Sequence, residues 1–306
     1  MASLPDRRGP SMLAPPLPTA GLRNVKKALL VAACLLATAA SAQAQTLDRI
    51  RSTNTINIAY RSDAFPFAFV DPSTRQPMGY TVDICKRVVA SIQQQLKLSN
   101  LQVKWVEATS QNRFDLVANR QADMECGSTT ATLGRMERVD FSNLVFVDGG
   151  GLLVRVESNI KAMADLAGKK IAVIGGTTTE TALNRALKQK LVNAQVVPVK
   201  SRDEGLQQLE RGTADAFASD RVLLVGMGDK ALDPKKLTML SEDFSFEPYA
   251  IVLPRGDAGF RTAVNRGLSQ LYGSGDIGQI FDRYFGNFGK PSVLLAAMFY
   301  LNALPE

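Results

Sequence analysis

The chain has 306 residues, of which 45% are hydrophobic and 21% are charged, so it can bury one large core or two smaller ones. It contains no histidine, which excludes imidazole-based acid–base catalysis, Ser/His/Asp and Cys/His nucleophiles, and zinc sites with imidazole ligands. The formal net charge is +7, but residues 1–45 carry five basic residues and one acidic residue, so the rest of the chain has a net charge of +3. No Lys/Arg cluster alternates with aromatic residues. We therefore expect no nucleic-acid surface, no metal site and no cofactor.

The first 45 residues have the order of a secretory signal peptide. Basic residues precede the apolar run 28–40, and small residues end it. The run is shorter than the roughly 20 apolar residues of a membrane-spanning helix. Cys34 leaves a lipoprotein cleavage box as an alternative. We predict a signal peptide with an N-terminal extension over 1–45 and a mature chain in the periplasm.

Strand and helix patterns alternate from residue 54 onward. Ile56 and Ile58 fall on one side of the first extended segment, and apolar residues recur at helical spacing in the segment that follows it. The predicted elements are, in chain order, a strand, a helix, a strand, a helix and a strand at 55–60, 82–96, 101–106, 110–122 and 123–125. Ser110 is expected to cap the second of these helices. This order is typical of an α/β sheet.

A second unit of the same kind starts near residue 160. Its elements are, in chain order, a strand, a helix, a strand, a helix and a strand at 171–174, 178–191, 194–197, 202–211 and 214–218. Thr177 and Glu180 have the spacing of a capping box, and we expect the second of these strands to stop before Pro198. A strand at 249–253 and two further helices at 257–273 and 276–285 complete the pattern.

Two segments between these units are candidate crossings. Residues 146–151 contain three consecutive glycines, and residues 242–246 also allow the chain to change direction. Two crossings imply a hinge. We therefore predict an α/β fold of two lobes with a ligand cleft between them. The first lobe would contain 46–148 and 246–306, and the second would contain 149–245.

Several strand ends and helix starts carry residues suited to a charged ligand. Backbone N–H groups at a helix start bind anions, and a guanidinium can hold both oxygens of a carboxylate. The segment 125–130 followed by Arg135, and the segment 175–180, both fit this description. Asp220 ends an apolar strand, where a carboxylate can receive an ammonium group. The alternatives are ordinary turns and caps with solvated arginines.

Three further arginines are cleft candidates. Arg113 lies in the first turn of a predicted helix, where the helix dipole disfavours a cation, and a bound anion would explain it. Arg61 and Arg202 each follow a strand. Each of these arginines, taken singly, is also compatible with a solvated surface position.

The order of these motifs resembles the periplasmic polar amino-acid-binding family, specifically its glutamate/aspartate-binding branch. The resemblance spans about residues 47–285 and rests on the motifs Ser110–Arg113, Glu125–Thr130, Arg135, Val139–Ser142 and Gly176–Thr178. It implies a type II periplasmic-binding-protein fold and glutamate or aspartate as the ligand. It also implies membrane permease subunits of an ABC importer as partners and a monomeric chain.

The resemblance also implies roles for individual residues. Arg135, with the backbone N–H groups of Thr130 and Thr178, would hold the α-carboxylate. Ser128 and Asp220 would take the α-ammonium group.

The side-chain carboxylate would lie among Arg61, Ser110 and Arg113, with Phe65 as an apolar wall. Arg202 stands where the branch can place a histidine, so the preference between glutamate and aspartate stays open.

The cysteines depart from the branch as well. Its usual partner for Cys126 is missing from the strand at 249–252. An oxidising compartment would permit Cys85 and Cys126 to pair instead, but the sequence does not show whether they meet.

Two other functions are compatible with the same fold. The first is an enzyme similar to cyclohexadienyl (prephenate/arogenate) dehydratases, for which Glu125 would be the candidate general acid. The second is a sensing module that presents amino-acid occupancy to a receptor. We expect a binding protein rather than an enzyme, because the motifs favour recognition of an amino acid.

Overall fold

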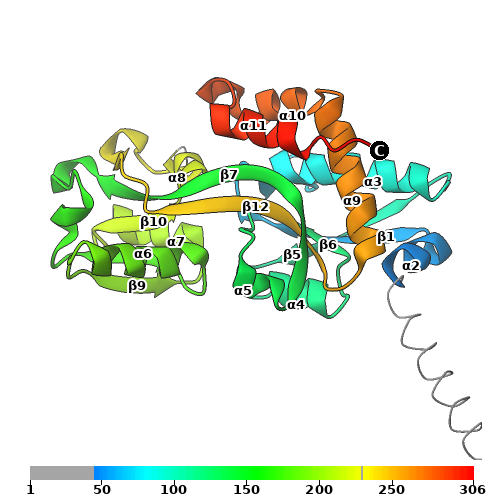
Figure 1. Ribbon diagram of the computed structural model, residues 1–306. Coiled ribbons are helices and arrows are strands. Elements are labelled where there is room, and N and C mark those ends of the chain that lie inside the picture. Colours follow the sequence, from blue (N-terminus) through cyan, green and yellow to red (C-terminus); the bar gives the residue numbers. More distant parts are fainter. Residues whose placement is uncertain (1–44, 229) are drawn as a thin grey trace, which may run out of the picture. The chain divides into compact units, whose positions relative to one another are not determined.

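The computed structural model describes residues 45–228 and 230–306, so the predicted signal peptide, apart from its last residue, lies outside the described residues. One large sheet runs through the molecule (Figure 1). Its strands are, in spatial order, β5 (Gln102–Ala108), β1 (Thr55–Arg61), β6 (Met124–Cys126), β12 (Ser245–Pro254), β7 (Val139–Arg155), β10 (Ala216–Asp220), β8 (Lys170–Ile174) and β9 (Gln195–Val199), while β11 (Leu237–Met239) pairs with β7. A small second sheet contains β2 (Asp63–Ala64), β3 (Ala68–Val70) and β4 (Pro77–Met78).

The two ends of the large sheet are parallel, and its middle is antiparallel. Strand β1 is parallel to β5 and β6, and β8 is parallel to β9 and β10. Between these ends, the long strands β7 and β12 lie side by side, with Asp148 opposite Glu247 and Gly150 opposite Ser245 (Figure 1). The predicted α/β architecture is confirmed. The chain passes between its two lobes along a hydrogen-bonded ribbon rather than along loose loops.

Helices cover both faces of the sheet. They are α2 (Gln45–Thr53), α3 (Tyr80–Gln95), α4 (Arg113–Ala118), α5 (Leu133–Met136), α6 (Thr178–Gln189), α7 (Arg202–Glu210), α8 (Arg221–Gly228), α9 (Ala258–Gly273), α10 (Ile277–Phe285) and α11 (Val293–Asn302). In the second lobe, alternate residues of one strand enter two different cores: Ala218 of β10 packs with Val173, whereas Phe217 packs with Ala172. A strand buried on both faces needs apolar side chains at consecutive positions, which is the pattern of Ala216, Phe217 and Ala218.

The predicted helix at 110–122 is shorter in the structure. Thr109 and Asn112 bond reciprocally, the N–H of Thr109 to Oδ1 of Asn112 at 2.7 Å and the N–H of Asn112 to the Thr109 hydroxyl at 3.2 Å. This local turn competes with the helix, so α4 begins at Arg113, and Ser110 does not cap it. The left-handed conformation of Arg120, with φ of 57°, follows the last turn.

The predicted end of the strand before Pro198 was also wrong. Strand β9 continues to Val199, and Pro198 lies opposite Val173 of β8. Because β9 is at the edge of the sheet, the missing N–H of Pro198 interrupts no ladder on its outer side.

A disulfide joins Cys85 of α3 to Cys126 of β6, with a Cα–Cα distance of 6.5 Å. Helix α3 lies over the first lobe's strands and brings the two residues together. The bond connects the core directly to the loop at 127–130, which follows β6.

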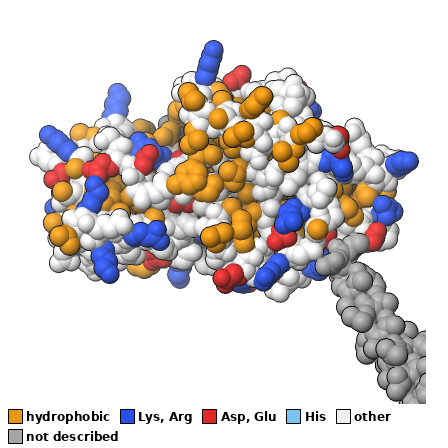
Figure 2. All heavy atoms as spheres, viewed as in Figure 1, with side chains coloured by type: hydrophobic (Ala, Val, Ile, Leu, Met, Phe, Trp, Pro, Cys, Tyr) orange, Lys and Arg blue, Asp and Glu red, His pale blue; other side chains and the backbone are white. Residues whose placement is uncertain are grey.

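The C-terminal helix α11 packs on the first lobe through Leu295 and Met298. Its Val293, Tyr300 and Leu301 are exposed, and hydrophobic side chains gather on the surface where α10 and α11 lie (Figure 2). In the part of the chain that the structure describes, no helix combines the length and the apolar character that a membrane span requires.

Candidate functional site

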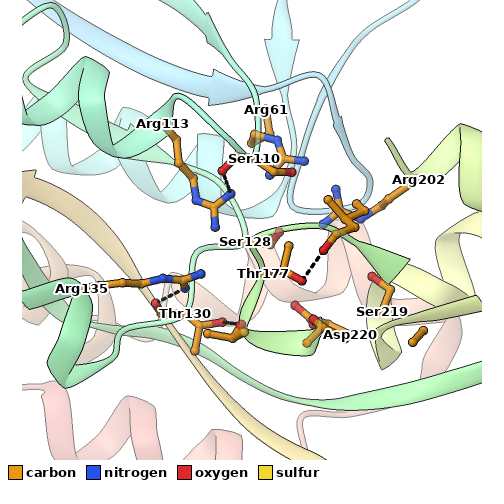
Figure 3. Close-up of a pocket in the computed structure, with 14 residues that line it drawn as sticks. Arg61, Ser110, Arg113, Ser128, Thr130, Arg135, Thr177, Arg202, Ser219 and Asp220 are labelled. Carbon is orange, nitrogen blue, oxygen red and sulfur yellow. Dashed lines mark hydrogen bonds between the residues drawn. The ribbon is translucent and has the colours of Figure 1, made fainter. Parts of the chain in front are cut away.

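All nine predicted site residues line one cavity (Figure 3). The predicted residues are Arg61, Ser110, Arg113, Ser128, Thr130, Arg135, Thr178, Arg202 and Asp220. The other lining residues are Ile174, Thr177, Thr179, Ala218 and Ser219. Most of the lining side chains are polar or charged, so the cavity suits a small polar ligand.

Strand ends bring these residues together. Arg61 ends β1, Ser128 follows β6, and Asp220 ends β10. The carboxyl ends of parallel strands meet at the same edge of a sheet. Strand β10 runs antiparallel to β1 and β6, so the carboxyl ends of the two sets of strands face each other across the cleft, and residues far apart in sequence converge there. Both lobes contribute, since β1 and β6 belong to the first and β10 to the second.

The N-terminus of α6 forms part of the second lobe's wall. The hydroxyl of Thr177 accepts from the N–H of Glu180 at 3.1 Å, as the capping spacing predicts. The Glu180 side chain accepts from the N–H of Gly176 at 2.7 Å, and Gly176 has the positive φ of 75° that suits glycine. Thr178 and Thr179 occupy the first turn, where N–H groups lack intrahelical partners and favour a negative charge.

Four guanidinium groups surround the cavity: Arg61, Arg113, Arg135 and Arg202, which we call the arginine cluster (Figure 3). Asp63 holds two of them. Arg61 donates from Nε and Nη2 to the two oxygens of Asp63 at 2.9 and 2.8 Å, and Nη1 of Arg202 donates to the same carboxylate at 3.2 Å. Burial acts to raise the pKa of Asp63, but Arg202 and Arg61 lower it below its usual value.

The remaining two arginines are positioned by backbone and by an aromatic ring. Nη1 of Arg113 donates to the carbonyl of Ser110 at 2.8 Å, and Nη1 of Arg135 donates to the carbonyl of Thr130 at 2.7 Å. The Cζ atoms of Arg113 and Arg135 lie 4.7 and 5.0 Å from the centre of the Phe114 ring. These cation–π contacts hold the guanidinium planes while leaving further N–H donors for a ligand.

Several buried polar atoms in this site lack a partner. Nε of Arg113, Nε of Arg202 and the hydroxyl of Ser128 have no hydrogen-bond partner within residues 45–228 and 230–306. Burial lowers the pKa of Arg61 and of Arg113 to about 10, so both stay cationic at neutral pH. Buried unpaired donors are costly, and an anion in the cavity would satisfy them.

Three carboxylates lie at the crossing between the lobes: Asp148, Asp220 and Glu247, which we call the hinge carboxylates. The Tyr249 hydroxyl bonds to Asp220 and also to Asp148, the latter at 3.3 Å. The Thr179 hydroxyl donates to Asp220 at 2.7 Å.

Glu247 connects the two walls of the cleft. One of its oxygens accepts from the hydroxyl of Thr130, in the first lobe, at 2.6 Å and from that of Thr178, in the second lobe, at 2.8 Å. Its other oxygen accepts from the Ser245 hydroxyl at 2.6 Å.

Proximity and burial raise the pKa of two hinge carboxylates. Burial, followed by the negative charge of Asp220, raises the pKa of Asp148 to about 7. The same two causes raise the pKa of Glu247. The hinge side of the cleft is therefore acidic, and Asp148 is close to titrating at neutral pH, whereas the arginine cluster carries positive charge.

The sequence did not indicate two residues that organise the site. Asp63 follows Arg61 by two residues in a short strand, and this spacing was its one available signal. Glu247 lies next to a predicted crossing, but its bonds to both lobes depend on the register of β12 against β7.

Phe65 is not among the lining residues. It packs instead against Phe69, with ring centroids 5.0 Å apart, and against Gly226 of α8.

A metal site is not formed by the residues described. Within 45–228 and 230–306, no group of three or more Cys, Asp or Glu side chains could hold a metal ion. The arrangement of fixed cations, helix N–H groups and one central carboxylate can bind a zwitterion that carries extra negative charge.

Known proteins share this architecture. Residues 56–287 match the family model of bacterial extracellular solute-binding proteins, family 3. An L-glutamate/L-aspartate-binding protein of Pseudomonas aeruginosa is 35% identical over 78% of this chain and 80% of its own length. A glutamate/aspartate import solute-binding protein of Escherichia coli is 33% identical over 81% of this chain and 82% of its own length.

A solved structure extends the comparison to three dimensions. An ancestral amino acid-binding protein, described as a precursor of cyclohexadienyl dehydratase, has a TM-score of 0.68 and 25% identity. The match covers 79% of this chain and all of that chain. The predicted type II binding-protein fold is confirmed.

Proposed function

Because the chain belongs to the bacterial extracellular solute-binding proteins of family 3, we propose that it captures glutamate or aspartate and delivers it to the permease subunits of an ABC importer. It is a binding protein, not an enzyme. The observation that carries the choice of ligand is the arginine cluster, whose buried donors are unfilled among the described residues. We place the chain in the periplasm and expect it to act as a monomer.

The α-amino-acid group would bind near the hinge. Arg135 and the first turn of α6 would hold the α-carboxylate, since both offer N–H donors to the cavity. Ser128 and Asp220 would take the ammonium group. Each oxygen of Asp220 already accepts one hydroxyl and keeps a second lone pair for the ligand.

The side-chain carboxylate would bind at the other end of the cavity. Arg61, Ser110 and Arg113 would surround it, and Arg202 would add a fourth charge from the second lobe. Asp63 keeps Arg61 and Arg202 together and prevents their mutual repulsion from opening this end.

Binding would stabilise the closed arrangement of the lobes. We take Asp148 and Phe246, which lie on the β7/β12 ribbon, as the hinge between a first lobe of 46–148 and 246–306 and a second lobe of 149–245. A ligand that contacts both walls has a higher affinity for the closed state and shifts the population toward it. The closed state would then be the form that the importer recognises.

Isothermal titration of the mature chain tests the proposal. The protein is unfolded and refolded to remove carried-over ligand and is then titrated with glutamate, aspartate, glutamine and arginine. We expect micromolar or tighter binding of glutamate or aspartate and much weaker binding of the other two. Tight binding of glutamine or arginine would refute the role of the arginine cluster. Absence of binding to all four would refute the proposed function.

A further inference from the structure

We propose that Glu125 takes up a proton when an acidic amino acid occupies the cavity, so that ligand capture is coupled to proton uptake inside the protein. The inference rests on the proposed function. Glu125 does not line the cavity, so it acts through the arginine cluster and not through contact with the ligand.

The carboxyl group of Glu125 is fully buried in β6, with no exposed surface. Among residues 45–228 and 230–306, neither of its oxygens has a hydrogen-bond partner. The Thr129 hydroxyl lies close enough to lower the pKa of Glu125 but does not have the geometry of a hydrogen bond. A buried carboxylate without hydrogen bonds depends on nearby positive charge to stay ionised.

Gly127 fixes the place of this carboxyl group. A Cβ atom at Gly127 would lie 2.3 Å from Oε1 of Glu125 and 3.2 Å from Cγ of Arg61. The carboxyl group therefore packs against the loop backbone beside the Arg61 stem, and any larger residue at 127 would displace it.

Apolar residues and guanidinium groups face Glu125. Within the sheet it lies beside Ala59 of β1 and Val252 of β12, which carry no charge. The charged groups that act on it most strongly are Arg113, Arg61 and Arg135. Burial raises the pKa of Glu125, and these arginines limit the rise.

An anionic ligand would weaken the effect of these arginines on the pKa of Glu125. Its carboxylates would bind the same guanidinium groups that stabilise the ionised form of Glu125. The negative charge of the ligand then cancels their effect, and the pKa of Glu125 rises further. If this rise passes the ambient pH, the carboxyl group binds a proton from solvent as the ligand enters.

Asp148, at the hinge, should respond in the opposite direction. The ammonium group of the ligand near Asp220 favours ionised carboxylates, so Asp148 would release protons as Glu125 takes one up. The number of protons that the wild type exchanges on binding is therefore the sum of uptake by Glu125 and release at the hinge. The contribution of Glu125 is the difference in this number between wild type and Glu125→Gln.

The experiment is titration calorimetry with glutamate at pH 5, 6, 7 and 8, in pairs of buffers that differ in ionisation enthalpy. The dependence of the observed enthalpy on the buffer gives the number of protons exchanged. We expect wild type to take up more protons than Glu125→Gln, with a maximum difference of about one proton and a difference in the pH dependence of Kd of up to about tenfold per pH unit. Glu157→Gln, at a residue whose side chain is 78% exposed, is the matched control and should behave as wild type.

Equal proton numbers for wild type and Glu125→Gln at every pH would refute this inference while leaving the proposed function intact. Failure of the wild type to bind any acidic amino acid would refute both. Infrared difference spectroscopy of the wild type gives a second measurement that does not require the variant to fold. Glutamate addition should produce a protonated-carboxyl band, and its absence over the whole pH range would also refute the inference.

Discussion

The arginine cluster and the hinge carboxylates lie at the same cleft, but they differ in whether their polar atoms already have hydrogen-bond partners within the protein. Arg113 and Arg202 are buried, and each has a donor without a partner in the described chain. The three hinge carboxylates accept bonds from hydroxyl and backbone groups of both lobes.

The unpaired arginine donors are available to a ligand, whereas the paired carboxylates connect parts of the protein to one another. Unpaired buried donors cost free energy in the empty state, and a ligand that pairs them recovers it. Paired carboxylates at the crossing stabilise one arrangement of the lobes without a ligand. Variants in the first group should therefore change ligand affinity directly. Variants of Asp148 and Glu247 should change stability, pH dependence and the balance between open and closed lobes.

The largest effect is expected from Arg135→Ala. Its loss would leave the α-carboxylate of the ligand buried without its cation, which should weaken binding by about 2 to 5 kcal/mol. Titration calorimetry against glutamate measures the change. Arg138→Ala is the matched control, because Arg138 is 61% exposed and pairs with Asp115 at the surface, where a salt bridge contributes about 0 to 1 kcal/mol. Equal affinities of the two variants would contradict the assignment.

Asp148→Asn should change the pH dependence of stability. The pKa of Asp148 is about 7 in the folded protein, and an unfolded aspartate has a pKa of about 3.9. The folded state therefore binds more protons, and the free energy of unfolding of the wild type should fall as the pH rises from about 4 to about 7. The expected loss is on the order of 2 to 4 kcal/mol. Urea unfolding at pH 4, 5, 6 and 7 should show this slope reduced in the variant, and parallel curves would contradict the prediction.

Glu247→Gln should destabilise the closed arrangement of the two lobes. The amide keeps one oxygen acceptor but loses the negative charge that receives hydroxyls from both lobes. Hydrogen bonds to a charged group are the stronger ones, so we expect ligand affinity to fall by about 1 to 2 kcal/mol. Small-angle scattering with and without glutamate should show a smaller compaction than in wild type. An unchanged compaction and Kd would show that Glu247 has no role in closure.

Arg202→His should produce the smallest change. A shorter side chain at this position leaves more room in the cavity and removes a permanent charge, so binding of glutamate should improve relative to aspartate by about 1 kcal/mol. Competition between the two ligands measures the ratio. A shift toward aspartate would place Arg202 away from the side-chain carboxylate.

Most of the fold could be predicted because the patterns are local. The apolar spacing of α3 and the consecutive apolar residues 171–174 of β8 and 216–218 of β10 depend on neighbours in the sequence. The errors came from interactions that propensity does not describe. The turn between Thr109 and Asn112 delays α4, and the edge position of β9 tolerates Pro198.

The cavity residues could be predicted because they follow strands and carry charge in a recognisable order. The partners that hold them could not. Glu125 and Glu247 act through contacts that form only when β6, β7 and β12 are in register. Asp63 acts through Arg202, which is 139 residues away in the sequence. The pairing of Cys85 with Cys126 likewise depends on how α3 packs over β6, which spacing alone does not determine.

The position of the cavity residues beyond the strand ends has a consequence for evolution. Arg61, Ser128 and Asp220 close or follow strands whose interiors supply the core. A mutation at such a position can change which solute is selected with little effect on the ladder or the core beneath it. Related proteins with this layout can therefore acquire new ligand preferences without losing the fold, and their specificity can diverge faster than their core sequence.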